Sequence, residues 1–300
     1  MDMTQNKCCR HGASLRRRRR RRRKILRSII FSCSIIAVAV FVAVGSRMIR
    51  SGDGRTNRYD VEAGNNTYDN AVIENSKISE KNKIQNNQSM LDDIMNSTQY
   101  PKQLKDLALK NEEALEFVYD YPAEHVKEHT IDLTEEASMD SVPLFVQWDK
   151  RWGYEKYSGN FFAASGCGPT TLSMVVVYLT HNREASPIAV AKYSKETGYS
   201  VDGSGSSWTL ISEGCMHYGV KAKTVALDES RMKAELDEGH PIVVNVGPGD
   251  FTDTGHFMVT TGYDDEGFSI NDPNSIEKSG KRWLFRNISS QIRAVWSMYV

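Results

Sequence analysis

The chain has 300 residues, enough for one domain of ordinary size with accessory segments. Its 38 basic and 38 acidic residues cancel, but the two signs are unevenly distributed along the chain. The first 50 residues carry 14 Lys and Arg and one acid, whereas residues 51–300 carry 24 basic and 37 acidic residues, a net charge of −13. Because nucleic-acid binding needs clustered cations, the acidic body argues against a nucleic-acid partner for this part of the chain.

A membrane anchor is predicted near the N-terminus. A run of eight arginines, Arg16–Arg23, precedes an apolar stretch in which the 18 residues Ser28–Gly45 carry no charge. At about 1.5 Å per residue, a helix of this length nearly crosses a hydrocarbon core of roughly 30 Å. We therefore predict a transmembrane helix over residues 25–46 that contacts the lipid bilayer. Since the basic flank stays inside, residues 1–24 are predicted to be a basic cytoplasmic tail, and the rest of a single-pass protein of the cell membrane faces outward.

A cleaved signal peptide is the alternative interpretation of this segment. Ala43, Val44 and Gly45 offer a small-residue cleavage site. In that case the mature protein is secreted.

Residues 47–97 are polar and rich in Asn, so we predict a flexible stalk. Helical periodicity begins at Pro101, and we expect one amphipathic helix of about 18 residues that starts behind a Ser97 or Thr98 cap and ends at Pro122. Residues 98–140 are thus predicted to be a helical extension of the following domain.

Residues 141–300 have the composition of a packed domain. The pattern predicts helices first, at 168–179, 187–196, 207–218 and 229–238. Strands follow at 242–246, 256–263, 268–271 and 294–300. This order indicates an α+β domain in two layers, a helical layer packed on an antiparallel sheet.

Cys167 is the candidate nucleophile of the domain. It lies between Gly166 and Gly168, with Pro169 and an apolar helix directly after, so it is expected at a helix N-terminus. Free N–H groups and the helix dipole lower the pKa of a thiol at such a position. The flanking glycines also allow a substrate to approach the backbone. A lone cysteine would otherwise be interpreted as a small buried hydrophobic residue, which is how we interpret Cys215.

A base, an orienting group and an oxyanion donor can be assigned to the same site. His256 opens a predicted strand, and Asp272 follows the next strand, so a hairpin can bring the carboxylate to the imidazole. Asn271 is the rival for the orienting role, but adjacent strand residues point to opposite faces, so only one of the two can serve. Gln147, twenty residues before Cys167, can donate an amide N–H to an oxyanion.

Other features line the predicted cleft. The Gly- and Ser-rich run 201–207 lacks the Lys of a phosphate loop and is interpreted as a turn near the cleft. Ser207 and Gly255 join Gly166 and Gly168 as candidate cleft residues, and the loop 248–250 is expected to border the same cleft. His217 and His240 have no evident metal-ligating companions in the sequence. No metal and no cofactor is assigned.

The residues in the order Gln, Cys, His and Asp resemble the bacteriocin-processing, double-glycine-leader cysteine peptidases, and more closely their stand-alone C39-like relatives. The motifs that carry the resemblance are Val142–Gly153, Ser165–Thr170, Gly255–Tyr263 and Asn271–Pro273. The resemblance implies a papain-like fold. It also implies that Gln147 is the oxyanion residue, Cys167 the nucleophile, His256 the base and Asp272 its orienting partner. No transporter or ATPase region follows the domain, so we do not expect export-coupled cleavage of leader peptides.

The combined hypothesis is a thiol-dependent peptidase that cleaves a peptide or protein substrate outside the membrane, through an acyl-enzyme on Cys167. A catalytically silent peptide-binding module and an acyltransferase that uses the same cysteine are the alternatives. The intact set of four residues argues against the silent module.

Overall fold

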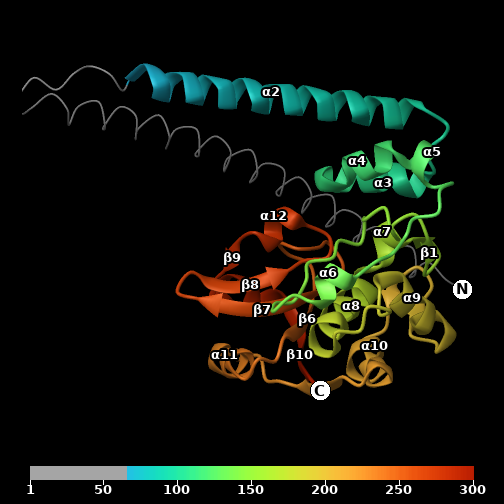
Figure 1. Ribbon diagram of the computed structural model, residues 1–300, viewed down its shortest axis with the longest axis vertical. Coiled ribbons are helices and arrows are strands. Elements are labelled where there is room, and N and C mark those ends of the chain that lie inside the picture. Colours follow the sequence, from blue (N-terminus) through green and yellow to red (C-terminus); the bar gives the residue numbers. More distant parts are fainter. Residues whose placement is uncertain (1–65) are drawn as a thin grey trace, which may run out of the picture. The chain divides into compact units, whose positions relative to one another are not determined.

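A six-stranded antiparallel sheet forms the centre of the domain (Figure 1). The computed structural model describes residues 66–300, with side chains from residue 79, and residues 70–300 form one unit. The strand order is β5-β10-β6-β7-β8-β9. The bounds are β5 Lys221–Thr224, β10 Ile292–Tyr299, β6 Ile242–Val246, β7 His256–Asp264, β8 Gly267–Asn271 and β9 Arg282–Trp283. Two short hairpins lie apart from this sheet, β1 (Lys156–Tyr157) with β2 (Asn160–Phe161) and β3 (Ser200–Val201) with β4 (Gly205–Ser206).

The central strands bury both of their faces. On β6 and β7, Val243, Phe257 and Val259 belong to one buried cluster, while Val244 and Met258 belong to another. Side chains alternate along a strand, so these two sets lie on opposite faces of the sheet. A continuous apolar run such as Ile242–Val246 is the pattern expected of a strand covered on both sides.

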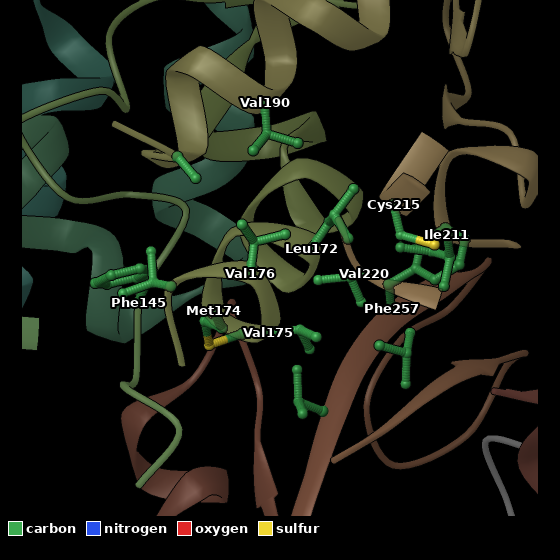
Figure 2. Close-up of a cluster of buried hydrophobic side chains, with 14 of the residues drawn as sticks. Phe145, Leu172, Met174, Val175, Val176, Val190, Ile211, Cys215, Val220 and Phe257 are labelled. Carbon is green, nitrogen blue, oxygen red and sulfur yellow. The ribbon is translucent and has the colours of Figure 1, made fainter. Parts of the chain in front are cut away.

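Helix α8, Cys167–Thr180, packs on the first face of the sheet. Every residue from Gly168 to Val177 is buried, because the helix has neighbours on several sides. Figure 2 shows Leu172 and Val176 of α8 between Val190 of α9 (Pro187–Glu196) and Phe257 of β7. The predicted helices at 168–179 and 187–196 and the α+β class are confirmed. Pro169 is the third residue of α8 and lies in the first turn, where an N–H has no intrahelical partner.

Helices also cover the second face of the sheet, which differs from the two layers that were expected. Met232 of α11 (Glu229–Asp237) and Ile288 of α13 (Phe285–Ile288) join the cluster on that face. The remaining helices are short: α6 Thr134–Ala137, α7 Phe162–Ser165, α10 Thr209–Ser212, η2 Gly214–Tyr218, α12 Ile276–Ser279 and η3 Ser289–Gln291. The single helix expected at 207–218 is thus α10 followed by the 3-10 helix η2.

The helical extension is broken where one helix was expected. Helix α3 covers Lys102–Lys110, and Asn111 then takes an extended backbone conformation. The 3-10 helix η1 (Glu112–Ala114), α4 (Leu115–Tyr119) and α5 (Tyr121–Glu124) follow, and Pro122 lies inside the first turn of α5 instead of ending a helix. The Asn111 side chain stabilises the break between the helices, because its oxygen accepts a hydrogen bond from the backbone N–H of Glu113 and caps η1.

Residues 66–96 form helix α2, whereas the sequence predicts a flexible stalk up to residue 97. Ile94, near its C-terminal end, is fully buried in a cluster with Leu104, Leu115 and Phe117 of the extension. Among the helices of residues 66–300, none is both long and apolar enough to cross a membrane. The anchor predicted at residues 25–46 and the tail at 1–24 lie outside the described residues.

Candidate active site

Cys167 is the first residue of α8, and its side chain is half-buried. Burial alone would raise the pKa of the thiol, but the hydrogen bond and positive charge of His256 and the backbone N–H groups of Phe257 and Gly168 outweigh it, so the pKa is lowered. Cys215 is a useful contrast. It is fully buried in the core, as expected, and burial raises its pKa to about 11. Both cysteines of the described residues are free thiols.

The sheet brings His256 and Asp272 together. Asn271, the last residue of β8, pairs with Val259 of β7, so Asp272 follows at the end of the strand next to the one that His256 opens. His256 Nε2 lies 2.7 Å from Asp272 Oδ1. This contact leaves Nδ1 as the ring nitrogen available to the Cys167 thiol. The Asn271 amide instead donates to the carbonyls of Val142 and Pro143, away from the imidazole.

His256 and Asp272 are almost completely shielded from water, with exposed fractions of 6% and 0%. Burial lowers the pKa of the imidazole, but the charge and hydrogen bond of Asp272, together with Cys167, overcome burial and raise this pKa to about 10. The thiol pKa is lowered and the imidazole pKa is raised, which is the direction expected for a thiolate–imidazolium pair. The arrangement can therefore present a nucleophilic thiolate and a proton donor side by side.

Gln147 lies beside the same site and is buried. Its Nε2 donates to the Ala163 carbonyl at 2.7 Å, which fixes the orientation of the side-chain amide. An amide nitrogen carries two hydrogens, so one remains for a further acceptor. Gln147 and Cys167 line the same pocket, so an oxyanion donor at this position is compatible with the geometry.

Two pockets meet at Cys167 and form the two arms of one cleft. The first, about 650 Å³, lies between α3, the loop 249–255 and Lys278 of α12. The second, about 700 Å³, lies between the residues 203–206 of the Gly- and Ser-rich run, Trp208 and Arg293. The loop 248–250 borders the cleft as expected. An extended peptide can thus pass over Cys167 with one end in each arm.

The four expected cleft residues differ in their placement. Gly255 lines both arms. Gly166 and Gly168 are buried and line neither arm. A Cβ atom at Gly166 would lie 2.6 Å from the Phe162 ring, and one at Gly168 would lie 2.6 Å from Ser206 Oγ. These glycines allow close packing around α8 instead of substrate approach. Ser207 also lies outside both pockets and hydrogen-bonds the Thr209 hydroxyl.

Sequence reasoning missed the contribution of the extension to the site. Gln103, Asp106 and Lys110 of α3 form a wall of the first arm. Their polar character and helical spacing are equally typical of an exposed helix face, so no local signal marks them. The contact with the cleft arises only from tertiary packing.

His240 has neighbours that the sequence did not indicate. Its side chain and those of Glu235 and Glu238 offer ligand atoms that all lie within 4.8 Å of one another. Glu235 is already engaged by Lys223 Nζ at 2.7 Å and by the Ser297 hydroxyl at 2.7 Å. Glu235 thus forms an ion pair with Lys223, and the cluster lies outside the cleft.

Comparison with known proteins decides the family. The model of the Peptidase_C39 like family matches residues 139–300, which is more than half of the chain. The chain belongs to the Peptidase_C39 like family. This membership and the α+β fold place residues 139–300 among C39-like peptidase domains.

Two solved structures are similar to the C39-like domain. The peptidase domain of Streptococcus ComA, a bi-functional ABC transporter involved in a quorum sensing pathway, is 18% identical with a TM-score of 0.39. The match covers 53% of this chain and 96% of that one. A Bacillus anthracis protein described as a C39-like peptidase is 17% identical with a TM-score of 0.33, covering 53% of this chain and 95% of that one. No match was found among curated proteins.

Proposed function

We propose that the chain is a thiol-dependent peptidase that hydrolyses an amide bond through an acyl-enzyme on Cys167. One observation carries the proposal: His256 lines the same pocket as the thiol at the N-terminus of α8 and lowers the pKa of that thiol, and its Nε2 lies 2.7 Å from the buried carboxylate of Asp272. A nucleophile, a base and an orienting group in series are what acyl transfer requires.

In the proposed mechanism, the Cys167 thiolate attacks the carbonyl carbon of the scissile bond. The Gln147 amide and the Cys167 backbone N–H stabilise the oxyanion of the tetrahedral intermediate. The imidazolium of His256 then protonates the leaving amine. A water molecule, deprotonated by the neutral imidazole, hydrolyses the thioester and regenerates the thiolate, while Asp272 keeps the ring in one orientation throughout.

The proposed substrate is an extended peptide or protein segment outside the membrane. The two-armed cleft supports an extended backbone that crosses Cys167. The basic head and apolar segment of residues 1–46 support anchorage with residues 47–300 on the outer side. The proposed organisation retains the tail at 1–24, the anchor at 25–46 and the C39-like peptidase domain at 141–300.

The test is turnover of a broad peptide library by the full-length protein in water enriched in ¹⁸O, read by mass spectrometry. We expect cleaved peptides whose new carboxyl groups carry ¹⁸O, and no cleavage by Cys167→Ala or His256→Ala. Products joined to an added amine, without ¹⁸O, would instead favour the acyltransferase. Unchanged turnover by Cys167→Ala would refute the nucleophile assignment, and complete absence of turnover would favour the silent binding module.

A further inference from the structure

The loop that carries Asp272 is in contact with the N-terminal extension. Asp272 Oδ1 accepts a second hydrogen bond, at 2.8 Å, from the backbone N–H of Asn274. Asn274 is in turn held by Asn111, whose Nδ2 lies 2.9 Å from the Asn274 carbonyl and 3.1 Å from its side-chain oxygen. Asn111 thus binds the same residue, Asn274, whose backbone N–H contacts the Asp272 carboxylate.

Glu113 holds the next residues of the same loop. Its Oε2 accepts from the backbone N–H groups of Ile276 at 2.7 Å and Glu277 at 3.1 Å, and its Oε1 accepts from the Ser275 hydroxyl. The N–H groups belong to the first turn of α12, where no intrahelical acceptor exists and a carboxylate is favourable. Two side chains of the extension therefore satisfy polar groups of residues 274–277.

The backbone of Asp272 is held by Ser275 and Ser279, but its carboxylate has few contacts. The carboxylate is completely buried, and its Oδ2 has no hydrogen-bond partner in the structure. Among residues 79–300, only His256 and the Asn274 N–H hydrogen-bond to Oδ1, so displacement of Asn274 removes one of the two groups that fix the carboxylate. Residues of the domain also hold this loop: the backbone N–H of Gln147 donates to the Pro273 carbonyl at 2.7 Å, and Trp148 Nε1 donates to the Asn274 carbonyl at 3.3 Å.

We infer that Asn111 and Glu113 are positioning residues of the catalytic site, which act by holding the loop 272–277 so that Asp272 keeps its contact with His256. Both residues lie before residue 139, where the family match begins. The extension is then a functional part of the site and not only a connection to it. The inference rests on the proposed function for its catalytic meaning, but the contacts that it describes can be tested without turnover.

The test compares the pH dependence of Cys167 alkylation by iodoacetamide in the full-length protein and four variants. Asn111→Asp and Asn111→Ser keep an oxygen that can cap η1 but lose the amide donor to Asn274. Asn111→Ser also avoids adding a charge. Glu113→Gln removes the carboxylate from the N-terminus of α12. Glu112→Gln is the matched control, because Glu112 is the neighbouring residue of η1 and its side chain accepts from Asn87 of α2 and from no other side chain of the described residues.

We expect the apparent thiol pKa to rise by about one unit in the Asn111 and Glu113 variants, because a loosened Asp272 stabilises the imidazolium less. Glu112→Gln should match the unchanged protein. With a cleavable peptide, kcat should fall between about tenfold and a hundredfold at constant KM, as expected for a misplaced catalytic group. The melting temperature of each variant is measured, and alkylation rates are compared at a temperature well below all of them, so that unfolding does not contribute.

Alkylation profiles of the Asn111 and Glu113 variants that coincide with that of Glu112→Gln would overturn the inference. An ordinary thiol pKa in the unchanged protein would also overturn it, because no imidazolium would then depend on Asp272. If the profiles shift as expected but no peptide is cleaved, the inference stands and the proposed peptidase function fails.

Discussion

At the scale of single residues, the same chain contains two thiols with opposite properties. Cys167 lies at a helix N-terminus beside an imidazole, and its pKa is lowered, whereas Cys215 lies among apolar side chains, and its pKa is raised to about 11. Burial acts in the same direction on both. Backbone N–H groups lower the pKa of both thiols, so the difference arises from His256, which only Cys167 has beside it.

Gln147 should affect the rate of the reaction at Cys167 without changing the pKa of the thiol. We expect Gln147→Ala to lower kcat by a factor of about 10² to 10³, or about 3–4 kcal/mol, because one oxyanion donor is lost. The pKa of the Cys167 thiol is set by burial, His256 and the N–H groups of Phe257 and Gly168. The pH dependence of Cys167 alkylation should therefore be the same in Gln147→Ala as in the unchanged protein.

The measurement is steady-state kinetics of a cleaved peptide together with alkylation rates between pH 5 and pH 10. Gln147→Glu serves as a second variant, since it nearly preserves the shape and removes the donor when ionised. A kcat within twofold of the unchanged protein in Gln147→Ala would contradict the oxyanion role.

At the scale of secondary-structure elements, regular apolar patterns made prediction possible. The valines of α8 and the continuous apolar run of β6 each indicate their element locally, and the structure has both elements within a few residues of the expected bounds. The edge strand β5 was missed because Lys221–Thr224 is mostly exposed and has no apolar alternation. Local sequence carries no signal for such a strand.

The same reasoning explains what could be predicted of the candidate site. Cys167, His256 and Asp272 could be placed together because a helix start and a hairpin impose their geometry. The contact between Asn111 and Asn274 joins residues 163 positions apart and depends on how the extension packs. The roles expected for Gly166 and Gly168 were also misplaced, because the close neighbours Phe162 and Ser206 are visible only in three dimensions.

Glu235 joins helix α11 to two strands and gives an acid-dependent stability. The hydrogen bond from Lys223 of β5, followed by that from Ser297 of β10, lowers the pKa of Glu235 to about 2. His240 also faces this carboxylate, at 3.3 Å. A folded-state pKa below the unfolded value of about 4.3 stabilises the fold above that value, and the contribution is lost as the pH falls toward 2.

We therefore expect Glu235→Gln to lower the free energy of unfolding by about 1–2 kcal/mol at pH 7, after allowance for solvent screening. The loss should be about half as large at pH 3. Urea unfolding followed by circular dichroism measures both. Glu229→Gln on the same helix is the control, because its pair with Lys233 is exposed. Equal losses at the two pH values would contradict the assigned contribution of Glu235.

At the scale of the whole molecule, the distribution of charge separates two parts with different proposed environments. Residues 1–50 are strongly basic, and residues 51–300 carry a net charge of −13. The proposed topology places Cys8 and Cys9 in the cytoplasm and Cys167 outside. Three cysteine positions can thus report on the topology of the unmodified chain.

Labelling of intact cells with a membrane-impermeant maleimide tests this arrangement. We expect modification of Cys167 in intact cells and of Cys8 and Cys9 only after permeabilisation, read by mass spectrometry of the cysteine peptides. Cys215 is fully buried and should stay unmodified in both cases, which provides an internal control for unfolding. Labelling of Cys8 and Cys9 but not Cys167 in intact cells would contradict the proposed orientation.

The pH dependence of Cys167 alkylation, compared with His256→Ala, tests the central claim most directly. In the unchanged protein, we predict that the rate at pH 6 stays within about threefold of the rate at pH 8.5, because the paired thiolate persists at the lower pH. In His256→Ala, the rate should fall by about a hundredfold over the same range, as for a thiol with a pKa of about 8.5 or above. Parallel profiles that both follow an ordinary thiol would contradict a Cys167–His256 ion pair and the catalytic account built on it.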